Sequence, residues 1–189
     1  MPAAPLPLPH LSSTVAGQQS VRKALGLPAD VSPIIFCPGA EFGPAKRWPV
    51  RHFAALAAQF SADLPNNPVW LIGSEKDQPI GDQITQVSRG AALNLCGMTT
   101  LDQAIDLIAT ASLVVANDSG LMHVAASLDR PLVALYGSSS PSYTPPLSPC
   151  AKIVSVHVPC SPCFKRVCPL GHFDCLELLT PAMVQQQLD

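Results

Sequence analysis

Short apolar runs alternate along this chain with segments in which apolar residues recur every three or four positions. Mostly apolar runs of four or five residues between turn-forming residues are typical of buried β-strands, and they fall at residues 34–37, 69–72, 93–96, 113–116, 132–136 and 153–156. The periodic segments predict amphipathic helices, at residues 20–25, 53–60, 77–87, 101–108 and 121–128 and from Thr180 onward. This alternation predicts an α/β fold, a Rossmann-like parallel sheet with right-handed crossovers and helices on both faces.

The carboxyl ends of parallel strands meet at one edge of a sheet, and ligands of such sheets bind in the crevice there. Four turns at this predicted edge carry unusual polar residues, and they follow the strands that end at Phe36, Ile72, Ala116 and Tyr136. The last turn, residues 137–149, offers neutral hydroxyl donors, although a proline-rich surface loop explains its composition as well. We therefore expect a ligand site to be built from these turns.

The segment from Asn117 to His123 combines a strand end, a polar turn and a helix start. Asn117, Asp118 and Ser119 are all residues that cap helix N-termini. Free backbone N–H groups and the helix dipole suit a phosphate or a sugar hydroxyl there, although an ordinary capped helix explains the motif as well. A carboxylate would repel a diphosphate, so we expect Asp118 to cap the helix or to accept from sugar hydroxyls. His123 lies about one turn into the helix, where it can donate to an anion or pack in the core.

The turn from Pro38 to Pro49 combines glycines with two adjacent basic residues. Gly39 lets the backbone approach a ligand closely. Lys46 and Arg47 precede a predicted helix, where positive charge is unfavourable unless an anion is bound. Because cationic side chains suit phosphate, we favour an anion site here over a solvated loop.

The turn after residues 69–72 places two carboxylates near a helix start. An acidic residue after the second strand can hydrogen-bond ribose hydroxyls. Glu75 is the better candidate for this role, because helix capping explains Asp77 equally well. Ser74 precedes Glu75 and belongs to the same predicted substrate site.

Composition narrows the classes of function. Charged residues make up only 13% of the chain and apolar residues 48%, which favours helices on both faces of a buried sheet, or an exposed interface. A net charge of −2 without a basic run argues against a nucleic-acid partner. No apolar stretch reaches the roughly 18 residues that span a bilayer. The proline-rich first nine residues lack the features of a signal peptide.

Seven cysteines without a secretion signal indicate a reducing compartment. Cys160, Cys163, Cys168 and Cys175 form a C-x2-C-x4-C-x6-C pattern in a loop that spans residues 157–176. The C-x2-C half is a common chelate for zinc, whereas the remaining spacing matches no standard finger. Three interpretations stay open: a structural zinc, a disulfide pair, or free thiols in a lid loop.

Three motifs together resemble the ADP-heptose:lipopolysaccharide heptosyltransferases, a family of GT-B glycosyltransferases; the motifs are residues 37–49, 117–125 and 131–137. The resemblance covers about residues 33–189. It implies the carboxyl-terminal half of a GT-B fold, with residues 33–189 as the ADP-sugar donor-binding domain and residues 1–32 as an interdomain linker with a short helix. In this family the amino-terminal domain supplies the acceptor site and the general base. We therefore expect this chain to be the donor-binding half and to be inactive by itself.

The resemblance also implies a reaction and a place. The family transfers L-glycero-D-manno-heptose from ADP-heptose to an inner-core heptose of lipopolysaccharide, with inversion at the anomeric carbon. No cofactor is required for the transfer. The implied location is the cytoplasmic face of the inner membrane, with no membrane span and with peripheral association of the full-length enzyme.

By resemblance, Lys46 contacts the donor diphosphate and stabilises the leaving group, and Glu75 lies near the ribose. Residues of the third turn and the following helix line the diphosphate and the heptose; these are Asp118, Gly120, Leu121 and His123. The predicted substrate site also includes Gly39, Ser74 and Ser119. No residue of the chain is expected to act as the general base. Two other functions remain open: a non-catalytic nucleotide-sugar-binding module and a sugar-nucleotide epimerase-like domain.

Overall fold

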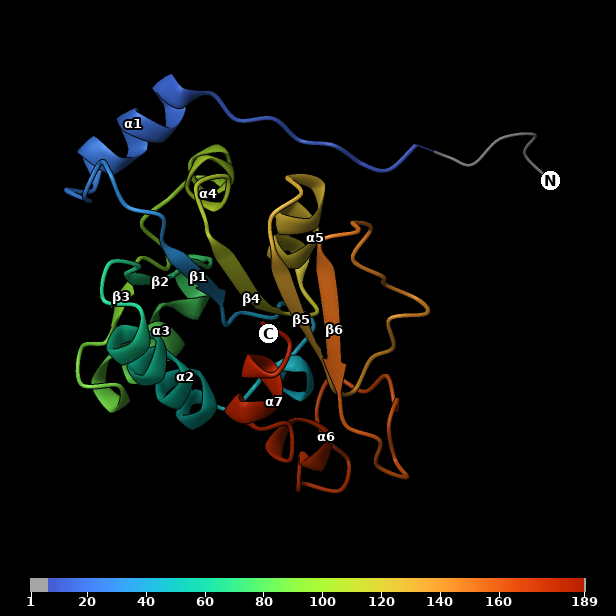
Figure 1. Cartoon of the computed structure of the whole chain (residues 1–189). Helices are drawn as coiled ribbons and strands as arrows, with labels where there is room; N and C mark the ends of the chain where they lie inside the picture. The colour runs from blue at the N-terminus through green and yellow to red at the C-terminus, as the bar shows by residue number, and fades with distance from the viewer. Residues whose placement is uncertain (1–6, 189) are drawn as a thin grey trace.

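A six-stranded parallel sheet forms the centre of the molecule in the computed structural model, which describes residues 7–188. The strand order is β3-β2-β1-β4-β5-β6 (Figure 1). The strands are β1 (Ile34–Cys37), β2 (Val69–Leu71), β3 (Ala92–Asn94), β4 (Leu113–Asn117), β5 (Leu132–Tyr136) and β6 (Ala151–Ser155). This arrangement confirms the predicted Rossmann-like sheet. Ile34 of β1 pairs with Val69 on one side and with Leu113 on the other, so the chain reverses its direction across the sheet at β1 and β4.

Helices cover both faces of the sheet, as predicted (Figure 1). One face carries α2 (Val50–Asp63), α3 (Gln78–Val87), α6 (Asp174–Glu177) and α7 (Pro181–Gln185). The other face carries α4 (Leu101–Ile108) and α5 (Gly120–Ser127), and α1 (Val15–Ala24) packs on α4. Two short 3₁₀ helices, η1 (Pro44–Lys46) and η2 (Glu75–Asp77), follow the first two strands.

Strand β1 shows why its sequence is apolar throughout. Ile34 and Phe36 point into the core under α2 and α3, whereas Ile35 and Cys37 point into the core under α4 and α5. All four side chains are fully buried. A strand that is covered on both faces has no solvent side, so its sequence loses the apolar-polar alternation of a half-exposed strand.

The first helix differs from its predicted bounds. It begins at Val15 rather than at Ser20, and Thr14 is its N-cap, with a side chain that accepts from the Gly17 N–H at 3.1 Å. Only two residues of this helix are buried, so its apolar periodicity is weak and the cap was misplaced. Its end was predicted correctly, because Gly26 takes a positive φ of 65° just after the helix. Of the predicted linker, residues 1–6 lie outside the described residues.

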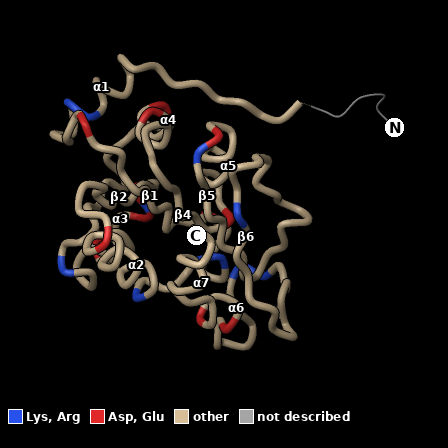
Figure 2. Tube along the Cα trace, viewed as in Figure 1, with Lys and Arg blue, Asp and Glu red and all other residues tan. Residues whose placement is uncertain are grey.

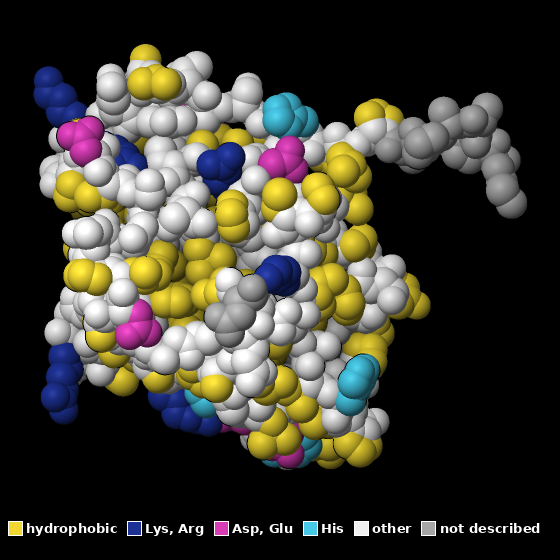
Figure 3. All heavy atoms as spheres, in the orientation of Figure 1, with side chains coloured by type: hydrophobic (Ala, Val, Ile, Leu, Met, Phe, Trp, Pro, Cys, Tyr) yellow, Lys and Arg dark blue, Asp and Glu magenta, His cyan; other side chains and the backbone are white. Residues whose placement is uncertain are grey.

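None of the helices described between residues 7 and 188 is long and apolar enough to cross a bilayer. Charged residues are spread over separate helices and turns of the described chain rather than gathered on one side (Figure 2). On the face shown in Figure 3, hydrophobic side chains reach the surface in many places and charged side chains are few. The surface therefore agrees with the low charge content of the sequence.

Candidate functional site at the switch point of the sheet

The turns after β1, β2 and β4 surround one cleft of about 470 Å³. Five of the predicted substrate residues line it, namely Gly39, Ser74, Ser119, Gly120 and Leu121. The chain leaves β1 toward β2 and leaves β4 toward β5, so the crevice between these two turns is the topological switch point at which α/β sheets bind ligands. Three of the four predicted turns therefore meet at this cleft, whereas the turn after β5 lines a different hollow.

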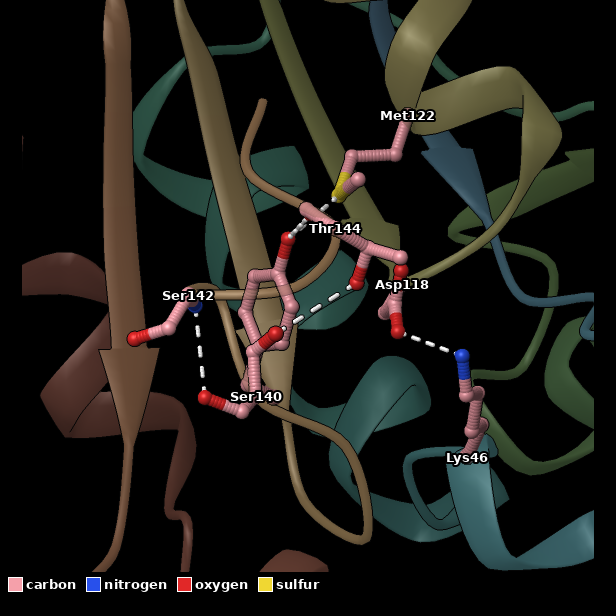
Figure 4. Close-up of polar contacts among 7 residues, drawn as sticks. Lys46, Asp118, Met122, Ser140, Ser142 and Thr144 are labelled. Carbon is pink, nitrogen blue, oxygen red and sulfur yellow. Dashed lines mark hydrogen bonds and ion pairs between the residues drawn. The ribbon is translucent and has the colours of Figure 1, made fainter. Parts of the chain in front are cut away.

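Lys46 and Asp118 form an ion pair beside this cleft (Figure 4). Lys46 lies at the end of η1, Asp118 follows β4 directly, and the distance from Lys46 Nζ to Asp118 Oδ2 is 2.5 Å. The side chains are only 15% and 4% exposed. Of the two roles expected for Asp118, capping of the following helix is wrong, because Ser119 occupies the N-cap position of α5. Acceptance from sugar hydroxyls stays a prediction. Asp118 instead neutralises and orients the one lysine that the sequence assigned to an anion.

A second hollow of about 260 Å³ is lined by Lys46, Ser139, Tyr143, Thr144 and Phe164. Within residues 7–188 the Ser139 hydroxyl is buried and has no hydrogen-bond partner. A buried hydroxyl without a partner is unfavourable. Lys46 therefore lines this second hollow together with residues of the turn after β5 and of the loop that contains Phe164.

Asn117 joins the first and third turns, a role that the sequence did not reveal. Its side chain is fully buried at the end of β4. Its Oδ1 accepts from the Trp48 N–H at 3.0 Å, and its Nδ2 donates to the Pro38 carbonyl at 2.8 Å. The expectation that Asn117 belongs to a helix cap is therefore wrong. An asparagine that ends a fully apolar run is itself a signal, because a buried amide must find partners.

The second turn is held by a capping box. Asp77 Oδ2 accepts from the Ser74 backbone N–H at 2.9 Å and from the Ser74 hydroxyl at 2.7 Å. Ser74 is thus the N-cap of η2 and Asp77 the partner three residues later. Asp77 also occupies the N-cap position of α3, but its side chain makes no capping bond there. Gly39 passes so close that a Cβ there would lie 2.4 Å from Asp77 Oδ2. The close packing of the first turn against the second therefore explains why position 39 is a glycine.

The rim of the cleft is charged. Glu75 is exposed on η2 and does not belong to the lining of the cleft. Next to it, Lys76 Nζ lies 2.9 Å from Glu41 Oε1 and links the second turn to the first. The hydrogen bond from Lys76 lowers the pKa of the Glu41 carboxyl. Cys37 also lines the cleft, and burial raises the pKa of its thiol far above neutrality, so this side chain adds no charge.

His123 lies in the first turns of α5 with an exposed side chain and is not part of the cleft lining. The alternative that it packs in the core is therefore wrong. A contact between His123 and a bound anion stays a prediction. The four cysteines of residues 157–176 lie together around a separate small cavity and are free thiols in the structure.

Comparison with known proteins relates this arrangement to one family. The model of "Glycosyltransferase family 9 (heptosyltransferase)" matches residues 3–174. Lipopolysaccharide heptosyltransferase 2 of Escherichia coli is 42% identical over 189 residues, which cover 98% of this chain and 54% of that protein. Lipooligosaccharide heptosyltransferase 2 of Haemophilus influenzae is 55% identical over 127 residues, which cover 65% of this chain and 36% of that protein.

The fold comparison agrees. The solved structure of E. coli ADP-heptose lps heptosyltransferase II superimposes with a TM-score of 0.76 at 40% identity, and the match covers 100% of this chain and 57% of that chain. A family 9 glycosyltransferase structure from Veillonella parvula also gives a TM-score of 0.76, at 24% identity. The chain spans about half the length of the relatives it matches over nearly its whole length.

Proposed function

The chain belongs to glycosyltransferase family 9, the heptosyltransferases, and we propose that it is the donor-binding half of a heptosyltransferase II. It binds ADP-heptose, and together with an acceptor-binding domain it transfers L-glycero-D-manno-heptose to an inner-core heptose of lipopolysaccharide. The observation that carries this proposal is the ion pair of Lys46 and Asp118 at the switch point, next to the start of α5. The reaction takes place at the cytoplasmic face of the inner membrane and needs no cofactor.

The concave surfaces suggest where the parts of the donor bind. A cleft of about 470 Å³ is in the size range of small-molecule sites, and its largely apolar wall suits an adenosine. Ser74 at the wall and Glu75 at the rim are placed for the ribose hydroxyls. The diphosphate then lies at the start of α5, where the N–H groups of Gly120 and Leu121 have no partners within the helix. The heptose points toward the second hollow and the Ser139 hydroxyl.

The chemistry follows from this placement. In the transition state of glycosyl transfer the sugar gains positive charge and the departing ADP gains negative charge. The Lys46 ammonium and the N–H groups at the helix start stabilise the leaving group because they are already oriented before the reaction. Asp118 holds Lys46 in place, so the diphosphate shares or takes over the ammonium when it binds. The base that deprotonates the acceptor belongs to the acceptor-binding domain, because inversion requires attack from the side opposite to ADP.

Binding and transfer assays test this proposal on the chain itself. In calorimetry the chain should bind ADP and ADP-heptose weakly. With heptose-acceptor lipopolysaccharide as the second substrate it should transfer no heptose. Turnover by the pure chain would contradict the assignment as a donor-binding half, and a change of ADP-heptose itself without an acceptor would favour the epimerase-like reading. Binding without transfer even after the acceptor-binding domain is added would favour a non-catalytic module.

Gly120→Ala should change the affinity for ADP without lowering the stability of the fold. Apart from its chain neighbours and its own helix backbone, no atom of the part of the chain that the structure describes lies within 4 Å of a Cβ at Gly120. Alanine should therefore leave the free energy of unfolding unchanged or slightly raised. If the diphosphate lies against the start of α5, the added methyl group occupies part of its space, and the ADP affinity should fall at least several-fold. Calorimetry and urea unfolding measure the two quantities. An unchanged ADP affinity would place the diphosphate elsewhere.

A further inference from the structure

Four cysteines surround a cavity that the proposed function does not use. The cavity measures about 20 Å³, and its wall includes Cys160, Cys163, Cys168 and Cys175. A space of this size holds about one water molecule or ion. The four thiols come from three separate pieces of chain: a C-x2-C turn, a second turn and helix α6.

The chain fixes each of these pieces. The C-x2-C turn is tied to the end of β5, because the Phe164 N–H donates to the Ser138 carbonyl at 2.7 Å and the Ser161 hydroxyl donates to the Gly137 carbonyl at 2.6 Å. Gly171 closes the second turn with a φ of 75°, and its N–H donates to the Cys168 carbonyl at 3.2 Å.

The fourth cysteine, Cys175, comes from helix α6. It is buried there next to Leu176, so the sheet core holds this ligand candidate in place.

Two polar groups of the same cavity wall have unused hydrogen-bonding capacity. Ser138 is 1% exposed, and its hydroxyl has no hydrogen-bond partner within the described residues 7–188. The His172 Nδ1 accepts from the Asp174 N–H at 2.9 Å, which turns Nε2 toward the cluster, 4.0 Å from Cys160 Sγ. A hydroxyl buried without a partner is costly, and a thiolate in the cavity would supply its acceptor.

We propose that Cys160, Cys163, Cys168 and Cys175 bind one Zn²⁺ ion as a tetrahedral tetrathiolate site. Four soft sulfur ligands favour zinc over the hard cations, and each thiol gives up its proton to solvent as it binds. Within residues 7–188 no three such side chains yet converge at coordinating distance. Rotation about the Cα–Cβ bond moves each sulfur, so the proposed site forms when the four cysteine side chains turn toward the cavity that they line.

The site lies directly behind Lys46. Ala45 is part of the cavity wall, and its N–H donates to the Arg166 carbonyl at 3.1 Å. A Cβ at Gly43 would lie 2.5 Å from the same carbonyl oxygen. Zinc would thus hold the loop of residues 157–176 against η1 and fix the position from which Lys46 reaches Asp118.

Metal analysis of the chain, purified without oxygen, tests the proposal. We expect about one zinc per chain. The double variant Cys160→Ser/Cys163→Ser should lose it. The matched control Cys150→Ser, which changes an exposed cysteine outside the cluster, should keep it. Exchange of Co²⁺ into the unaltered chain should give the visible absorption of a tetrahedral thiolate complex, which does not depend on how any variant folds.

Hydrogen exchange adds a local readout. In the double variant the amides of residues 157–176 and 43–47 should exchange faster, whereas the central strands should keep their protection. Zinc-free protein with four titratable thiols would overturn the proposal in favour of a free-thiol lid. A disulfide within the cluster, or iron at the same stoichiometry, would also overturn it.

Discussion

Lys46→Ala should lower the affinity of the chain for ADP by roughly 10- to 150-fold, because a hydrogen bond to a charged group contributes about 1.5–3 kcal/mol. The ammonium is the one charged group that η1 places at the switch point of the sheet, 2.5 Å from Asp118. Without it, the Asp118 carboxylate stays buried beside the diphosphate and repels it. AMP lacks the second phosphate, so its affinity should fall less. Calorimetric titration with both nucleotides measures the two losses.

Lys76→Ala is the matched control for this substitution. Lys76 carries the same charge near the same cleft, but it is exposed and pairs with the exposed Glu41, so its removal should change ADP binding little. The double variant Lys46→Ala/Asp118→Asn removes both buried charges and should unfold less easily than Lys46→Ala, which leaves one of them unpaired. Equal losses for ADP and AMP in Lys46→Ala would show that Lys46 does not contact the second phosphate.

Asn117→Ala should lower the free energy of unfolding by about 2–5 kcal/mol, because it leaves two buried backbone groups without partners at about 1–3 kcal/mol each. These groups are the Trp48 N–H and the Pro38 carbonyl, which lie 69 and 79 positions away along the chain. Both belong to the turn that carries Lys46, so ADP affinity should fall as well. Urea unfolding measures the change in stability.

Asn67→Ala is the control for Asn117→Ala, because it removes a side-chain amide that is exposed rather than buried. Asn67 also donates to a backbone carbonyl, that of Ser32, but in an exposed setting. Water can replace its hydrogen bonds, so its loss should cost less than about 1 kcal/mol. If Asn117→Ala and Asn67→Ala destabilise the chain equally, the buried amide does not hold the two turns together.

The fold could be predicted from the sequence because a sheet that is buried on both faces has strands that are apolar at every position. Runs such as Ile34–Cys37 and Leu132–Tyr136 are apolar at every position, and the helices between them show a helical period. Parallel strand pairing follows from this alternation. The start of α1 was missed because the helix is mostly polar, and because Thr14 and Ser20 look equally good as caps in the sequence.

The site could be predicted only to the level of its turns. Parallel strands bring the turns after β1, β2 and β4 to one edge whatever their side chains are, so five residues of the cleft lining could be predicted. Residues 99–104, which also contribute to the lining, carry no polar pattern that marks them as a ligand site and were not predicted. The hydrogen-bond and ion-pair partners of single side chains could not be predicted from the sequence. Asp118 and Asn117 both resemble cap residues locally, yet their contacts are to Lys46, Trp48 and Pro38, which come from the other side of the switch point. Both residues have a local preference for helix capping, but contacts with residues far away in the sequence decide their position.

The most direct test of the donor-binding assignment is the response of the backbone amides to ADP, measured by NMR on the isotope-labelled chain. The proposal predicts that the largest shift changes fall in residues 39–46, 73–75 and 118–121, the three turns that meet at the switch point. It also predicts little change at the opposite edge of the sheet, where a hollow of about 340 Å³ is lined by residues such as Leu64 and Leu93. Changes confined to that hollow, or no saturable change at any amide, would contradict the assignment.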